Sequence, residues 1–99
     1  MLNIEKTNEN GKAVFKLSGR LDTNTAPELE AAVKDIISGL TELVFDFGAL
    51  EYISSAGLRV LLSTQKAIGG QGEFKILNVN DTINEIFEVT GFSDILTIE

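Results

Sequence analysis

Apolar and polar residues alternate in two short runs at the start of the chain. Leu2 and Ile4 are flanked by polar residues, and a second run, Ala-Val-Phe-Lys-Leu, extends from Ala13 to Leu17. Between them lies Asn8-Glu9-Asn10-Gly11, and Asn-Gly adopts the positive φ angles of tight hairpin turns. The pattern predicts a β-hairpin whose second strand ends at Gly19.

A helical spacing of apolar residues follows this hairpin. Thr25-Ala26-Pro27-Glu28 has the form of a capping box, with Thr25 as N-cap, Glu28 three positions later and a proline in the first turn. Gly39 is the expected end of the helix. The apolar face comprises Leu29, Ala32, Val33, Ile36, Ile37 and Leu40.

Two further helices are expected in the second half of the chain. One opens at Ser54-Ser55 and ends at Gly69-Gly70, and the other is capped within Asn80-Asp81-Thr82 and ends at Gly91. Their apolar faces are Leu58, Leu61, Leu62 and Ile68 in the first, with Gln65 in the same register, and Ile83, Ile86 and Phe87 in the second.

Short runs rich in branched and aromatic residues separate these helices. Leu43–Phe47 predicts a strand buried on both faces, with Asp46 near its end, and Phe74–Leu77 predicts another. The tail after Gly91 is expected to pack as a coil or a short strand. The element order predicts one α/β domain, residues 1–99, with a mixed sheet of four to five strands covered by three or more helices.

Composition excludes several classes of function. Eight basic and 15 acidic side chains give a net charge of −7, which disfavours binding to nucleic acid or to anionic membranes. The chain has no cysteine and no histidine, so thiol chemistry and the commonest general base and metal ligand are absent. It has neither a membrane-spanning apolar run nor a signal-peptide pattern, so we expect a cytoplasmic protein that begins near Met1.

The pair Ser54-Ser55 stands where an apolar strand meets an apolar helix, and it admits three interpretations. As an N-cap, one serine would satisfy a free backbone N–H, a gain of about 1 kcal/mol. A cap accounts for neither the second serine nor Gly57, since glycine early in a helix is unfavourable. Gly57 therefore suggests a close approach of another backbone or of a partner. The other interpretations are a nucleophile and a phosphorylation site.

Helical spacing favours the phosphorylation site. Ser55, Arg59, Ser63 and Lys66 share one helix face, opposite the apolar positions. A phosphate on Ser55 would meet unpaired N–H groups at the positive end of the helix dipole, with Arg59 one turn away. A partner docking on this face would meet two additional negative charges. The simpler alternative for Arg59 and Lys66 is a solvated helix face.

A nucleophilic serine lacks the necessary partner. It needs a base, and the lysine of the same face, Lys66, lies three turns from Ser55. The G-x-S-x-G, phosphate-loop and G-x-G-x-x-G motifs are also absent. The sequence therefore disfavours a hydrolase, and we expect no enzymatic activity, no cofactor and no metal.

The segment LVFDFGALEYISSAGLRVLL, residues 43–62, resembles the motif of the STAS domain, found in bacterial anti-sigma factor antagonists and in sulfate transporters. Residues 19–29, GRLDTNTAPEL, and 87–92, FEVTGF, are also similar to the family. The resemblance implies a free-standing antagonist that binds an anti-sigma factor serine kinase and thereby frees the sigma factor. It implies phosphorylation by that kinase and resetting by a metal-dependent serine/threonine phosphatase.

The resemblance also assigns roles to individual residues. Ser55 matches the phosphorylated serine, and Ser54, the less favoured acceptor, stands where many members have aspartate. Asp46 matches the aspartate that ends the strand, with either a structural or a direct role. The resemblance and the shared helix face together give the residues expected to bind the partner: Asp22, Asn24, Ser54, Ser55, Ala56, Gly57, Arg59 and Ser63.

Two alternatives to the phosphorylated antagonist remain open. The chain would be a constitutive STAS scaffold, or a regulatory subunit of a membrane transport ATPase, if the same helix face binds a partner without phosphorylation. It would be a small enzyme if the pure protein turned over ATP or GTP. For the phosphorylated antagonist we expect a monomer.

Overall fold

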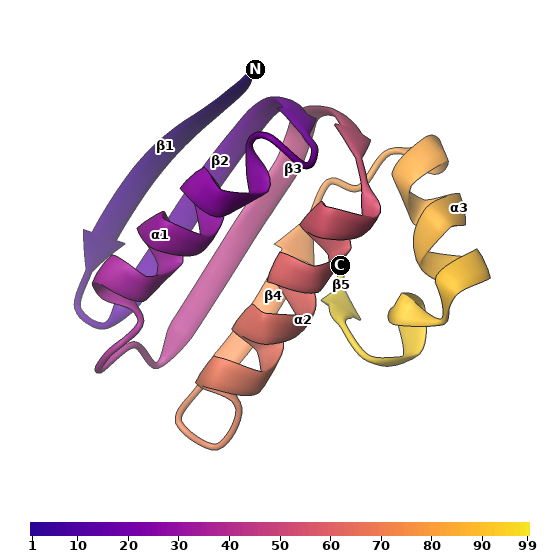
Figure 1. Cartoon of the computed structure of the whole chain (residues 1–99). Coiled ribbons are helices and arrows are strands. Elements are labelled where there is room, and N and C mark those ends of the chain that lie inside the picture. The colour runs from indigo at the N-terminus through magenta and orange to yellow at the C-terminus, as the bar shows by residue number, and fades with distance from the viewer.

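Two antiparallel strands, β1 (Leu2–Glu9) and β2 (Lys12–Leu21), begin the chain, which the computed structural model describes in full, from residue 1 to 99 (Figure 1). Asn10 and Gly11 turn between them with φ angles of 52° and 81°, so the predicted hairpin is confirmed. The second strand does not end at Gly19. Gly19 has a φ of 93° within β2, and a β-carbon there would collide with the carbonyl oxygen of Met1.

The remaining elements alternate between helix and strand. They are α1 (Ala26–Ile36), β3 (Glu42–Ile53), α2 (Ser55–Ile68), β4 (Glu73–Leu77), α3 (Asp81–Thr90), a short 3-10 helix (Phe92–Asp94) and β5 (Thr97–Ile98). The five strands are hydrogen-bonded in chain order, and β1–β2 is the antiparallel pair. The predicted mixed sheet with an N-terminal hairpin is confirmed, and the tail forms both a turn and a short strand.

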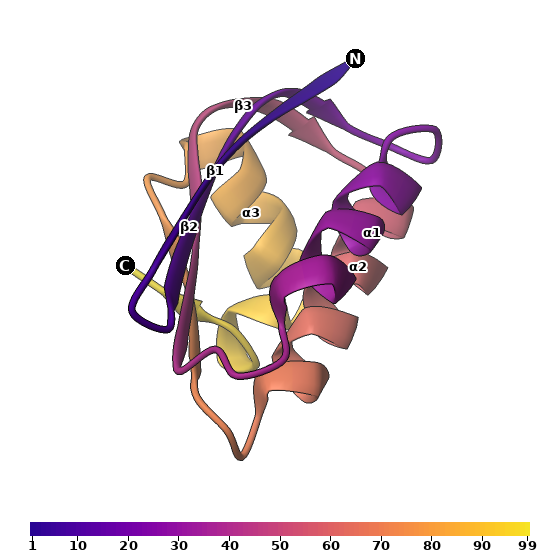
Figure 2. The same cartoon turned by 90° about the vertical axis from the view of Figure 1, so that its left-hand side faces the viewer.

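All three α-helices lie on the same face of this sheet (Figure 2). Right-handed crossovers between successive neighbouring strands place every helix on one side, which explains the arrangement. No helix covers the second face, yet Val44, which lies on it, is only 4% exposed, so within Leu43–Phe47 only Asp46 departs from the predicted burial on both faces. Asp46 points to that open face and is partly exposed, whereas Phe45 and Phe47 are fully buried.

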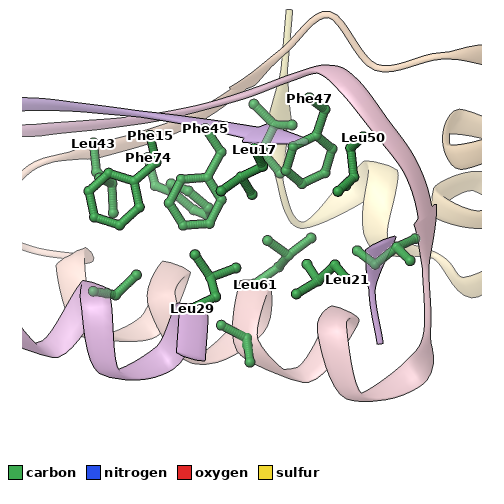
Figure 3. Close-up of a cluster of buried hydrophobic side chains, with 14 of the residues drawn as sticks. Phe15, Leu17, Leu21, Leu29, Leu43, Phe45, Phe47, Leu50, Leu61 and Phe74 are labelled. Atoms are coloured by element: carbon green, nitrogen blue, oxygen red, sulfur yellow. The ribbon is translucent and has the colours of Figure 1, made fainter. Parts of the chain in front are cut away.

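The core lies between the sheet and α1 and α2 (Figure 3). The ring of Phe45 stacks on Phe15 with centroids 5.5 Å apart and meets the edge of Phe74 at 4.8 Å. Leu29 of α1 and Leu61 of α2 point from the helices toward this row of rings. The helical apolar faces predicted from the sequence thus cover the aromatic face of the sheet.

Element boundaries differ from the prediction in two places that matter for the site. Strand β3 has 12 residues, so Asp46 lies within it and not near its end; what ends at Asp46 is the pairing with β4. Helix α1 ends at Ile36, and Leu40 is buried outside the helix.

Candidate functional site

The serine pair lies at one edge of the molecule, where β3 passes directly into α2 (Figure 1, top). Strand β2 ends at the same edge, because β2 and β3 are parallel and their last partners are Leu21 and Ile53. The N–H of Ser54 donates a hydrogen bond to the carbonyl of Leu21 at 2.9 Å. This bond brings the loop that begins at Asp22 next to the start of α2.

The two serines have different environments. Ser54 is the N-cap of α2, in extended conformation (φ −99°, ψ 176°), and its Oγ accepts a hydrogen bond from the N–H of Gly57 at 3.4 Å. Ser55 is the first helical residue and is exposed. Its hydroxyl makes no hydrogen bond within the chain. Of the two hydroxyls, that of Ser55 is the accessible one.

The helix face predicted for Ser55 is confirmed as a solvent-facing stripe. Ser55, Arg59, Ser63 and Lys66 are all exposed, while Leu58, Leu61 and Ile68 are buried. Neither Arg59 nor Lys66 forms an ion pair within the chain, and the first turn of α2 has no acidic residue. Both cations on this face are therefore available to an external anion.

Gly57 is required by the core and not by a neighbouring backbone or partner. It is buried, and a β-carbon at this position would lie 2.8 Å from Cγ1 of Ile53 and 2.8 Å from Cγ of Leu21. These distances are shorter than van der Waals contact allows. The close approach inferred from the sequence is thus real, but the atoms that approach are side chains of the same chain. Ala56, beside it, is partly exposed.

The capping box expected at Thr25 does not form. Thr25 is the N-cap residue of α1, but its hydroxyl is turned away from the helix: it accepts from the N–H of Asp22 at 2.8 Å and donates to the carbonyl of Arg20 at 2.9 Å. No side chain caps α1; Oδ1 of Asp22 instead accepts from the N–H groups of Asn24 at 3.0 Å and Thr25 at 3.1 Å, in the loop that precedes the helix. Partial desolvation raises the pKa of Asp22, but hydrogen bonds from Thr25 and Asn24 outweigh it and hold the pKa below its usual range.

The loop of residues 22–25 and the α2 face border a common hollow. Its volume is about 200 Å³, and it lies between the first turns of the two helices. It is lined on one side by Thr23, Ala26, Pro27 and Glu30 and on the other by Ala56, Arg59 and Val60. The structure therefore places the candidate residues from the two motifs side by side; Asn24 is exposed in the same loop, and buried Gly57 supports the site from below.

Asp46 is set apart from the serine pair. Its Oδ1 accepts hydrogen bonds from Nδ2 of Asn78 at 3.0 Å and from the N–H of Gly48 at 2.9 Å. The hydrogen bond from Asn78 contributes most to lowering the pKa of Asp46, and the bond from Gly48 contributes next. Partial burial raises this pKa, and attraction to Lys16 lowers it further. This carboxylate fixes the irregular part of β3 on the open face of the sheet, which agrees with a structural role.

Two neighbours of the site were missed by the sequence analysis. The guanidinium of Arg20 lies over the ring of Tyr52, 4.3 Å from its centroid. They are partners in the β2–β3 ladder, one pair before Leu21 and Ile53. A shift in register between Gly19 and Arg20 brings them together, and no local sequence pattern reveals such a shift.

Comparison with known proteins identifies the family. The STAS domain model matches residues 2–99. The chain belongs to the STAS family. The anti-sigma-B factor antagonist of Staphylococcus aureus is 33% identical to this STAS domain over 99 residues, covering 98% of the chain and 92% of the relative.

Solved STAS structures have the same fold. An anti-sigma factor antagonist from Mycobacterium paratuberculosis superposes with a TM-score of 0.89 at 25% identity, covering 99% of this chain and 85% of the other. The Bacillus protein SpoIIAA superposes with TM-scores of 0.78 in its unphosphorylated form and 0.76 in its phosphorylated form, at 20% identity. This chain is covered in full in both cases, and SpoIIAA to 87% and 91%.

The structure offers no preassembled metal cluster or membrane helix. No three or more Asp, Glu, His or Cys side chains gather as a cation would require. None of the helices is long and apolar enough to cross a membrane. The surface that combines exposed hydroxyls, free cations and a hollow is the one formed by α2 and the loop of residues 22–25.

Proposed function

We propose that this STAS protein is a cytoplasmic anti-sigma factor antagonist, which binds an anti-sigma factor with serine-kinase activity and is released when Ser55 is phosphorylated. The observation that carries the proposal is that the two serines have different structural environments. Ser54 is engaged as the cap of α2, and Ser55 presents an exposed hydroxyl at the start of a face with free cations. The names of the Staphylococcus and Mycobacterium relatives support the antagonist function.

The reaction at Ser55 is a phosphoryl transfer in which this protein is the substrate. The hydroxyl oxygen attacks the γ-phosphorus of ATP, its proton is lost, and ADP leaves, so the catalytic groups belong to the kinase. A metal-dependent phosphatase would restore the hydroxyl by hydrolysis. In this scheme the antagonist needs no base or cofactor of its own, in agreement with the absence of histidine and cysteine from the chain.

The phosphate would be tolerated by the antagonist and rejected at the interface. At the first position of α2 it meets free N–H groups and the positive end of the helix dipole. Arg59, four residues further along the helix, is exposed and unpaired and can approach the phosphate. A partner docked over this face would instead have to accommodate nearly two additional negative charges. The modification therefore changes binding without unfolding the protein.

The decisive experiment is intact mass spectrometry with site mapping after incubation with ATP and the anti-sigma factor kinase of the same organism. We expect one added phosphoryl group on the peptide that contains Ser54 and Ser55, and its loss in Ser55→Ala. No added mass, with the kinase active on another substrate, would contradict the proposal. The constitutive scaffold or transport subunit would then be favoured, and copurification with membrane ATPase subunits would identify the latter.

A further inference from the structure

Helix α3 lies at one edge of the helical layer, and Figure 1 shows no element on the side of α3 that faces away from α2. Ile83 and Phe87 point from its other side into the core. Two apolar residues lie outside that buried stripe: Val89 is 81% exposed, and Ile86, three positions earlier, is partly exposed. Val89 therefore has no evident role in the core of the free protein.

Acidic residues border Val89 on the surface of α3. Asp81, Glu85 and Glu88 follow one another at steps of four and three, so they share one side of the helix, and Val89 lies four residues after Glu85. All three acidic residues are exposed, and none of them forms an ion pair within the chain. Residues 76–99 contain no lysine or arginine. This side of α3 therefore combines exposed apolar surface with uncompensated negative charge.

The charges of α3 are arranged unfavourably for the helix itself. Like charges on adjacent turns of a helix repel each other. The last turn of a helix carries the negative end of the dipole and favours cations, yet in α3 it contains Glu88 and no basic residue. In α1, by contrast, the last turn contains Lys34, which pairs with Glu30 at 3.7 Å. Violations of local rules that bring no contact within the chain are typical of functional surfaces, and here a cation from outside would relieve them.

We propose that Val89 and the acidic residues Asp81, Glu85 and Glu88 form a docking surface for a cationic amphipathic segment of a partner protein. Lysine or arginine side chains of that segment pair with the carboxylates, and an apolar side chain packs on Val89. The same charges repel an acidic segment, a nucleic acid and an anionic membrane. The surface lies on α3 and does not include Ser55, so it extends beyond the proposed function and does not depend on it.

The test is the affinity of the protein for a fluorescently labelled peptide that carries lysine and leucine at helical spacing, measured by anisotropy at two salt concentrations. We expect the double variant Glu85→Gln/Glu88→Gln to bind the peptide roughly tenfold more weakly and with a smaller salt dependence, because two ion pairs are lost. Val89→Ser should weaken binding several-fold at both salt concentrations, since it removes an apolar contact and no charge.

The double variant Glu28→Gln/Asp35→Asn is the matched control. It removes the same amount of charge from exposed positions of α1 that form no ion pair. We expect it to bind the peptide within about twofold of wild type, because salt screens charges that lie away from the contact. Equal losses in the two double variants would show attraction to net charge alone and would overturn the inference. Wild-type affinity in both Glu85→Gln/Glu88→Gln and Val89→Ser would overturn it as well.

Thermal unfolding gives a readout that is independent of the peptide. Glu88→Gln keeps a side-chain oxygen that can accept the hydrogen bond from Nδ2 of Asn84 and removes only the charge. It should raise the melting temperature, because repulsion from Glu85 and the unfavourable interaction with the helix dipole are both lost. A melting temperature below that of wild type would show that the charge is favourable in the free protein, and the argument for an external cation would fail.

Discussion

The Oγ of Ser54 accepts a hydrogen bond from the N–H of Gly57 at 3.4 Å. This contact spans the first turn of α2 and satisfies one of the N–H groups that a helix leaves unpaired at its start. The hydroxyl oxygen of Ser54 is therefore used as a helix cap, whereas the hydroxyl of Ser55 is exposed and accessible to modification.

Removing the cap should reduce stability and leave the modification intact. We expect Ser54→Ala to lower the free energy of unfolding by about 1 kcal/mol, the usual value of an N-cap. In a domain of this size that corresponds to a decrease in melting temperature of roughly 4–8 °C. Ser54→Asp should restore the cap. If Ser54→Ala had the melting temperature of the wild type yet could not be phosphorylated, the roles assigned to the two serines would be reversed.

A charge at Ser55 should weaken partner binding. Ser55→Asp places one carboxylate at the start of α2, where it interacts favourably with the helix dipole but adds a negative charge to the proposed interface. We expect the dissociation constant for the anti-sigma factor to rise on the order of tenfold. Ser55→Asn has nearly the same shape without the charge and should bind much like wild type. Calorimetric titration of both variants checks this; equal, undiminished affinity of Ser55→Asp would exclude an electrostatic switch.

Gly57 cannot be enlarged without cost. In Gly57→Ala the new methyl group would lie 2.8 Å from Cγ of Leu21 and 2.8 Å from Cγ1 of Ile53. Overpacking of this kind costs about 1–3 kcal/mol, against a gain in helix propensity of up to about 1 kcal/mol. We expect a net loss of stability in chemical denaturation. Ser63→Ala, on the exposed face of the same helix, is the control and should be neutral or slightly stabilising.

Asp46 should make stability depend on pH. Its hydrogen bonds from Asn78 and Gly48 favour the carboxylate, so its pKa in the folded state lies below that in the unfolded state. The ionised carboxylate therefore stabilises the folded protein fully at pH values above its unfolded-state pKa of about 3.9. This stabilisation is lost as the pH falls through the folded-state pKa.

The matched variant for this effect is Asp46→Ala. Loss of two hydrogen bonds should cost about 1–3 kcal/mol at pH 7. Urea unfolding of both proteins between pH 7 and pH 3 should show the difference narrowing below about pH 4, as the wild-type carboxylate becomes protonated. A difference that is constant over this range would show that the charge of Asp46 plays no part.

Much of the fold follows from short stretches of the sequence. Asn10-Gly11 forms the hairpin turn because those residues tolerate positive φ angles. Asn80 caps α3 as predicted, with its Oδ1 accepting from the N–H of Ile83 at 2.8 Å, and Gly91 ends that helix with a φ of 82°. These features depend on residues within one turn of each other, so the sequence contains the information that decides them.

The site itself was predicted in part. The shared face of Ser55 and Arg59 follows from helical spacing alone. The sequence left open which serine caps α2, and it assigned to Thr25 a capping hydrogen bond that α1 does not have. Several hydroxyls and carboxylates stand near each helix start, and the path of the incoming strand decides which of them reaches the free N–H groups.

By itself, then, the sequence determined the order of the elements, the apolar faces that form the core and the exposed face that starts at Ser55, because each depends on local periodicity. The tertiary structure decided that every helix lies on one side of the sheet, that Gly57 is required by Leu21 and Ile53, and that Arg20 lies over Tyr52. Two of these contacts, Gly57 with Leu21 and Arg20 with Tyr52, join residues more than 30 positions apart through strand register and close packing. Such contacts are set by how the elements fit together in space, which no local pattern of residues determines.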